Sequence, residues 1–222
     1  MTYFKRLCVF SLAAWVLSAG SAAFADVSLP APQRTGGLGV LDAINRRASA
    51  KGADFAAMQE VSLEKLSTIL WAATGLNRGE RGWTVPMARG MEPYARIYVA
   101  KADGVFLSDW RTHALKEISK EDVRGRIGRA DFVAKAPSVL IFVSDEAALS
   151  KEYKDDDRVE EFAAVAVGAM TQNVYLASES QGVGARYVYS ANRDDIEKIL
   201  NLPDDDEILC IMPLGLRAEA QN

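Results

Sequence analysis

Apolar residues recur at helical spacing in several segments of the chain. In 63–74 the apolar positions are separated by three, four and three residues, which places them on one side of a helix. Ser62 precedes this stripe as an N-cap residue, and Gly75 follows it as a C′ glycine. Shorter amphipathic helices are predicted at 40–49 and 194–203.

The longest predicted helix runs from about 158 to 182, where apolar residues keep helical spacing throughout. The aspartates at 155–157 precede it, and acidic residues complement the positive end of a helix. Small residues crowd its middle, among them Gly168 and Ala169, so another surface can pack closely against it. Because the apolar stripe is larger than one sheet needs, we expect a homodimer with this helix at its interface.

Shorter apolar runs predict the strands. Residues 94–110 form a β-hairpin around an Asp103-Gly104 turn, and 138–144 is a continuous apolar run typical of a central strand buried on both faces. The intervening segment 117–137 predicts a helical or irregular crossover. Further strands are predicted at 185–190 and 207–216. This order of helices, hairpin and separate strands predicts an α+β fold.

Residues 1–25 have the three parts of a secretory signal peptide. Lys5 and Arg6 form a positive n-region, 7–19 is an apolar run of h-region length, and Ala23 to Ala25 give the small-x-small cleavage pattern. We therefore expect cleavage after Ala25 and a periplasmic or secreted protein without stable membrane insertion. The alternative is a retained amphipathic anchor.

The remaining chain divides into a flexible, extended arm at 26–37, one domain at 38–217 and a tail at 218–222. Its 30 acidic residues outnumber the basic ones, and no basic stripe is present, which argues against nucleic-acid binding. Cys210 is the only cysteine outside the predicted signal peptide. We interpret it as a buried strand residue without a disulfide.

Few residues suggest chemistry carried by side chains alone. His113 is the only histidine, and its polar surroundings indicate a solvated surface residue. Without a second histidine or a CxxC motif, an ordinary zinc site is excluded. The aspartates at 155–157 lack the spaced ligands and turn glycine of a calcium loop, so no metal site is predicted. An enzyme of this composition is expected to use an organic cofactor.

Three segments are suited to an anionic, planar cofactor. Residues 46–51 combine an arginine pair with a serine and a lysine, which form charge-assisted hydrogen bonds with phosphate. The glycine-rich loop 75–93, with an exposed-looking Trp83, offers backbone groups for close approach. The glycines at 182 and 184 let a ligand lie against bare main chain. Neither a GxGxxG motif after a strand nor a Walker lysine is present, which argues against those nucleotide-binding motifs.

The order of motifs resembles the nitroreductase family of flavin enzymes. It is carried by "VSLEKLSTILWAATGLNR", "WTVP", the hairpin "IYVAKADGVFLSDWRTHALKEI", "FVAKAPSVLIFVSD", "AVGAMTQNVYLASESQGVGARYV" and "LPDDDEILCIMPLG". The resemblance covers about 38–217 and is closest to the small exported or SagB-like dehydrogenase branch. It implies a mostly antiparallel central sheet flanked by helices, an intertwined homodimer, and FMN at the subunit interface.

The resemblance also assigns flavin contacts by position. The implied cofactor-binding residues are Arg46, Arg47, Ser49 and Arg217 at the phosphate, Pro86, Met87 and Ala88 in the loop beside the flavin, Gln172 and Asn173 on the long helix, and Gly182, Val183 and Gly184 at the isoalloxazine. Family members typically pass hydride or electrons through FMN to a small-molecule substrate by a ping-pong route.

The chain departs from the family pattern at several flavin-contacting positions. Trp83 and Met87 stand where relatives often carry an arginine and a serine, and Val188-Tyr189 stand where this branch often has Arg-Gly. Two functions follow. The first is an FMN-dependent oxidoreductase, and the second is a non-catalytic periplasmic binding or interaction protein that keeps the fold but has weakened or lost FMN binding.

Overall fold

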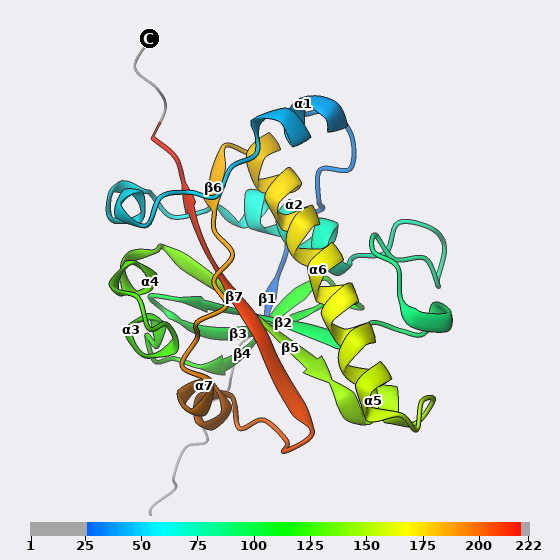
Figure 1. Cartoon of the computed structure of the whole chain (residues 1–222). Coiled ribbons are helices and arrows are strands. Elements are labelled where there is room, and N and C mark those ends of the chain that lie inside the picture. Colours follow the sequence, from blue (N-terminus) through cyan, green and yellow to red (C-terminus); the bar gives the residue numbers. More distant parts are fainter. Residues whose placement is uncertain (1–25, 219–222) are drawn as a thin grey trace, which may run out of the picture.

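The computed structural model describes residues 26–218, so the predicted signal peptide and all but the first residue of the predicted tail lie outside the described residues. A single sheet forms the centre of the molecule, in the order β1-β4-β3-β2-β5-β7-β6, with antiparallel pairing throughout (Figure 1). The strands are β1 Val27–Ser28, β2 Ala95–Lys101, β3 Gly104–Asp109, β4 Ala114–Ser119, β5 Ser138–Asp145, β6 Val183–Ala185 and β7 Asp206–Leu216. The predicted α+β fold with a mostly antiparallel sheet is confirmed.

Helices cover both faces of this sheet (Figure 1). They are α1 Val40–Arg46, α2 Leu63–Thr74, α3 Arg124–Ile127, α4 Asp131–Lys135, α5 Glu146–Ser150, α6 Asp156–Ser180 and α7 Arg193–Leu200, with 3-10 helices η1 Gly52–Ala57 and η2 Ala88–Gly90. Within the described part of the chain, no helix has both the length and the apolar character that a membrane crossing requires.

The central strand β5 separates two apolar cores. It pairs with β2 on one side and β7 on the other, and its residues 138–144 are all buried, as predicted. Leu140 and Phe142 face the core beneath α2 and α6. Val139 and Ile141 face the second core beneath η1, α3, α4 and α7. The alternation of the strand thus places α6 over one face of the sheet.

The segment predicted as a crossover begins as a strand. β4 pairs with β3, so the predicted hairpin is the first part of a three-stranded meander. The apolar pattern did not predict β4, because its polar side chains face the surface and form ion pairs such as Lys116 with Asp109 at 2.6 Å. The arm contributes β1, where Val27 pairs with Leu115 of β4. Leu29 of the arm is buried.

Three local predictions are corrected by packing. Trp83 is buried and packs edge-on against Trp110, with ring centroids 6.0 Å apart. Gly75 ends α2 as predicted, but with φ −76°, so left-handed geometry is not the reason for glycine. A Cβ there would lie 2.2 Å from the Trp71 side chain. The predicted strand 185–190 reduces to the end of β6 and a bridge from Val188 to β7.

Candidate functional site

Three segments that are distant in sequence meet at the C-terminal end of α6. Ala50 donates its backbone N–H to the carbonyl of Ala185 at 2.9 Å, which joins the segment after α1 to β6. Arg217, directly after β7, donates its N–H to the Gly182 carbonyl at 3.1 Å. The structure therefore brings together the predicted phosphate segment, the glycine turn and the late arginine.

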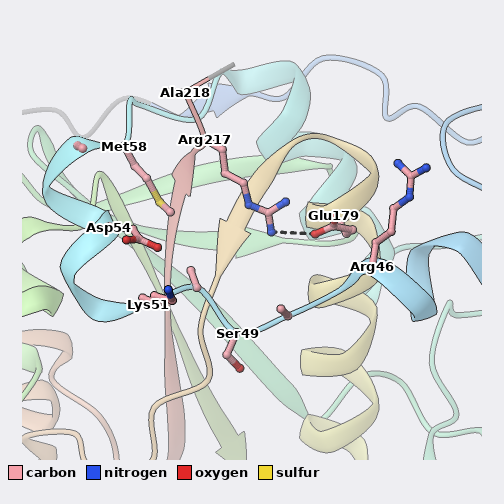
Figure 2. Close-up of a pocket in the computed structure, with 11 residues that line it drawn as sticks. Arg46, Ser49, Lys51, Asp54, Met58, Glu179, Arg217 and Ala218 are labelled. Atoms are coloured by element: carbon pink, nitrogen blue, oxygen red, sulfur yellow. Dashed lines mark hydrogen bonds and ion pairs between the residues drawn. The ribbon is translucent and has the colours of Figure 1, made fainter. Parts of the chain in front are cut away.

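The phosphate segment and Arg217, together with η1 and the end of α6, line a cavity of about 490 Å³ that is open to solvent (Figure 2). Its charged lining consists of three cationic and two acidic side chains. The polar and charged residues that line it are Arg46, Ser49, Lys51, Asp54, Glu179 and Arg217. Arg217 is held on one side, because its Nη2 donates to Glu179 Oε2 at 2.8 Å. Arg46, Lys51 and Arg217 supply cationic donors of the kind that phosphate binding requires, although the Arg46 guanidinium points away from Arg217 in Figure 2.

Arg47 is placed differently from its neighbour Arg46. Its guanidinium lies over the ring of Tyr175 on α6, 4.8 Å from the ring centroid, and its buried Nε has no partner among the described residues. The Tyr175 hydroxyl bonds Ser49 Oγ at 2.8 Å and accepts the Tyr187 N–H at 2.7 Å. Tyr175 therefore fastens the predicted phosphate segment to α6. Sequence reasoning missed Tyr175, which carries no motif of its own.

The glycine turn is exposed at Gly182 and covered by a side chain at Gly184. Gly182 has φ +70° and is exposed, as a turn glycine requires. Gly184 and Gly215 lie beneath the side chain of Met58, and a Cβ on Gly184 would come within 2.6 Å of Met58 Cε. The thioether of Met58 thus occupies the place that we predicted for a ligand over Gly184. No sequence signal relates Met58 to these glycines.

The remaining predicted contacts form a second group beside α2. Pro86 is exposed, Met87 is buried, and Ala88 donates its N–H to the Tyr94 hydroxyl at 3.3 Å. Asn173 Nδ2 donates to the carbonyls of Ala72 at 2.8 Å and Thr84 at 3.4 Å. This side chain therefore ties the loop to α2 and α6. The neighbouring Gln172 is exposed on α6.

Helix α6 separates the two groups. Asn173 bonds the loop, and Tyr175 bonds the phosphate segment; two residues along a helix correspond to about 200° around its axis. Figure 1 shows the segment after α1 and the loop between α2 and β2 on different sides of this helix. None of the predicted residues of the second group lines the cavity of the first.

His113 also departs from its predicted solvated state. It is half-buried, and its Nε2 lies 2.7 Å from Ser67 Oγ. Ser67 is fully buried and donates its only hydroxyl proton to the Pro30 carbonyl at 2.6 Å, so His113 must donate through Nε2. Burial lowers the pKa of His113. This pair therefore fastens the arm and is no nucleophilic dyad.

The described residues contain no group of three or more histidine, cysteine, aspartate or glutamate side chains placed to hold a metal ion. Cys210 is free and buried, and burial raises the pKa of its thiol to about 12. The thiol is therefore protonated at neutral pH, and the thiolate that reacts as a nucleophile is scarcely populated. The cavity beside Arg217 is thus the best candidate for a site.

Comparisons with known proteins identify the family of the chain. The model of a family described as "Nitroreductase family" matches residues 44–216. The chain is 32% identical over 169 residues to "Putative nitroreductase MJ1384" of Methanocaldococcus jannaschii, a match that covers 72% of this chain and 83% of the relative.

Solved structures show the same fold. A crystal structure from Ralstonia eutropha JMP134, of a protein described in the same way, has a TM-score of 0.78 and 33% identity, and covers 88% of this chain and 90% of that one. The NADPH:FMN oxidoreductase of Vibrio harveyi, complexed with NAD+, has a TM-score of 0.55 and 20% identity over 81% of this chain and 69% of that one. At that identity, the second likeness shows the fold alone.

Proposed function

The chain belongs to the nitroreductase family, and from this premise we propose that it is an FMN-dependent oxidoreductase acting on a small-molecule substrate. The observation that carries the proposal is the cavity lined by Arg46, Ser49 and Arg217. The fold of an FMN oxidoreductase from Vibrio harveyi supports the choice of cofactor. We also propose that the activity is periplasmic or secreted, which the predicted signal peptide supports, and that the chain is close to the SagB-like dehydrogenase branch, which the motif order supports.

The lining of the cavity suits the phosphate end of FMN. Arginine presents a planar set of donors that matches phosphate oxygens, and Arg46 and Arg217 approach the cavity from different elements. Ser49 adds a hydroxyl that the Tyr175 hydroxyl orients. These three side chains would bind the phosphate and so fix one end of the cofactor. The flavin, when bound, supplies the hydride and electron transfer.

The flavin ring requires the second group of residues, which α6 holds away from the cavity. In our proposal a partner subunit supplies this group, so that the site is complete only in a homodimer. Apolar side chains are exposed on the helices between the two groups: Val40 (64%), Leu41 (76%) and Ile44 (52%) on α1, and Val165 (65%) on α6. A Cβ at Gly168 would meet nothing within 4 Å, which leaves room for a partner.

Two observations favour a second candidate, a binding or interaction protein that has lost tight flavin binding. Trp83 and Met87 are buried, so neither presents a guanidinium or hydroxyl group to a flavin in place of the arginine and serine that relatives often carry, and the buried Trp83 Nε1 has no partner among the described residues. Met58 covers Gly184. A protein of this kind would keep the dimer and the fold while binding another molecule.

Flavin titration distinguishes the two candidates. Mature protein is titrated with FMN, and with riboflavin, which lacks the phosphate, by flavin fluorescence. We expect Arg46→Ala and Arg217→Ala to weaken FMN binding by roughly ten- to a hundredfold, because each loses a charged hydrogen bond, and to leave riboflavin binding unchanged. Arg126→Ala is the control, since Arg126 is exposed on α3, does not line the cavity and pairs with Glu121.

Absence of flavin absorbance after incubation with excess FMN would reject the enzyme and favour the second candidate. FMN binding that both cavity variants retain at wild-type strength would place the phosphate elsewhere. Loss of riboflavin binding in parallel with FMN would indicate that these arginines support the fold instead of the phosphate.

A further inference from the structure

Arg217 already has an anionic partner inside the cavity. Its guanidinium donates to Glu179 Oε2 at 2.8 Å, and the Glu179 side chain is only 12% exposed (Figure 2). Both residues line the same cavity. A phosphate that reaches Arg217 must therefore share the guanidinium with a resident carboxylate.

The other cationic side chains of the cavity have no anionic partner of this kind. Within residues 26–218, neither Arg46 nor Lys51 forms an ion pair within 4.0 Å. The second carboxylate, Asp54, likewise has no ion-pair partner there. The formal charge of the lining is three cations against two anions, so the carboxylates cancel most of the attraction for a dianion. Glu179 contributes most because it lies closest to a phosphate-binding donor.

The stability of α6 does not explain why a carboxylate stands at position 179. Glu179 lies one residue before the end of the helix, where the carbonyl groups form the negative end of the dipole. A carboxylate there is unfavourable to the helix, and a cation is favourable. The dipole of α6 therefore favours the cation Arg217 beside this end and disfavours the carboxylate of Glu179. The effect of the pair is instead on the charge of the cavity.

We propose that Glu179 competes with the phosphate of the cofactor for Arg217 and thereby weakens phosphate binding. The inference rests on the proposed function of the cavity. Glu179 is a positioning residue: its hydrogen bond holds the Arg217 guanidinium at the cavity wall, while its charge repels a dianionic group. Two opposed effects then act on one ligand: a hydrogen bond that a neutral acceptor can also form, and a repulsion that requires the charge of Glu179.

Glu179→Gln separates these effects, because the amide oxygen still accepts the hydrogen bond from Arg217. We expect this variant to bind FMN about tenfold more tightly than the wild type, and to bind riboflavin with unchanged affinity. At FMN concentrations well below its Kd, inorganic phosphate should also displace FMN from the variant at lower concentration, because the same repulsion acts on both anions. Glu179→Ala removes the charge and the acceptor, and is expected to tighten FMN binding by less.

Two matched controls accompany these variants. Asp54→Asn removes the cavity's other carboxylate, which forms no ion pair with Arg217 within 4.0 Å, and should tighten FMN binding by less than Glu179→Gln. Glu121→Gln removes an exposed carboxylate outside the cavity that pairs with Arg126 at 2.7 Å, and should change nothing. Thermal unfolding shows that each variant is folded.

The outcomes separate this inference from the proposed function. FMN binding to Glu179→Gln that equals or falls below the wild type, while Arg46→Ala still weakens it, overturns the competition and leaves the phosphate site in place. FMN binding to Glu179→Gln but not to the wild type would support the competition most strongly. Failure of the wild type and all Glu179 variants to bind FMN rejects the phosphate site and the inference together. An equal gain for riboflavin also contradicts the inference, because riboflavin carries no phosphate.

Discussion

At the residue scale, a small set of buried hydrogen bonds holds the arm at 26–37 on the domain. Ser67 donates to the Pro30 carbonyl, and His113 Nε2 lies within 2.7 Å of Ser67 Oγ and 3.2 Å of the Pro30 carbonyl. Arg34 is the charged group that acts on His113 from the arm itself. The arm leads into α1 and the phosphate segment, so its attachment helps to place Arg46.

We expect stability to depend on pH through His113. Burial lowers its pKa, so the unfolded chain binds the proton more readily than the folded one. The contribution of neutral His113 is therefore fully present above its ordinary pKa of 6.5 and is lost as the pH falls through its lowered value in the fold. Urea unfolding of the wild type should accordingly show lower stability at pH 5 than at pH 7.5.

His113→Gln tests this dependence, because the amide can still donate to Ser67 and does not titrate in this range. The stability of the variant should fall less than that of the wild type between pH 7.5 and 5. Carboxylates common to both proteins contribute equally to the two profiles. His113→Ala also loses the hydrogen bond and should destabilise the fold by about 1–2 kcal/mol at pH 7.5. An identical pH profile for wild type and His113→Gln would contradict the assignment.

At the element scale, α6 organises both halves of the candidate site. Tyr175 fastens the phosphate segment on one flank, and Asn173 fastens the glycine-rich loop on the other. The loop has little other regular structure, since η2 is its only helix and Arg89 within η2 has φ +49°. The Asn173 amide is therefore one of the contacts that hold this loop, beside the Tyr94 hydroxyl that accepts the Ala88 N–H.

Asn173→Ala should loosen this loop without unfolding the sheet. The variant loses hydrogen bonds to two backbone carbonyls, and we expect a loss of about 1–2 kcal/mol in stability. Hydrogen exchange should show faster exchange in 76–93 and unchanged protection in β5. Gln172→Ala is the control, because Gln172 is exposed and should change stability by at most about 0.5 kcal/mol. Equal exchange in the two variants would show that the loop is held by packing of Trp83 instead.

At the scale of the whole molecule, the exposed apolar side chains of α1 and α6 argue for assembly. Val165 and Gly168 lie on the outer side of α6, where neither contacts the core of its own chain closely. Burial of such residues in an interface removes apolar surface from water, which drives association. The proposed homodimer would also bring the loop of one subunit to the cavity of the other.

Val165→Asp and Gly168→Leu should disrupt this dimer while the monomer stays folded, because both positions are exposed. Light scattering at micromolar concentration should show a dimer for the wild type and monomers for the variants. FMN binding should weaken in the same variants. Ala102→Asp is the matched control, since Ala102 is exposed at the β2–β3 turn. A monomeric wild type would reject the dimer and the composite site.

Local sequence patterns determined the main elements and the fold class of this protein. The stripe of α2, its Ser62 cap and the apolar run of β5 depend on spacings of a few residues, and all three are confirmed. The cap is visible as a hydrogen bond from the Lys65 N–H to Ser62 Oγ. The collinear motifs also indicated the family, because they preserve the order of elements that such a fold requires.

Tertiary structure alone decided which side chains share a surface. Met58 covers Gly184, Tyr175 holds Ser49, and Glu179 pairs with Arg217. These contacts join residues far apart along the chain, so no local periodicity encodes them. Contacts between distant residues also explain why Trp83 is buried and why His113 forms a hydrogen bond with Ser67. The sequence could therefore nominate the phosphate-binding residues, whereas only packing determined which of them face the cavity and which partners they already hold.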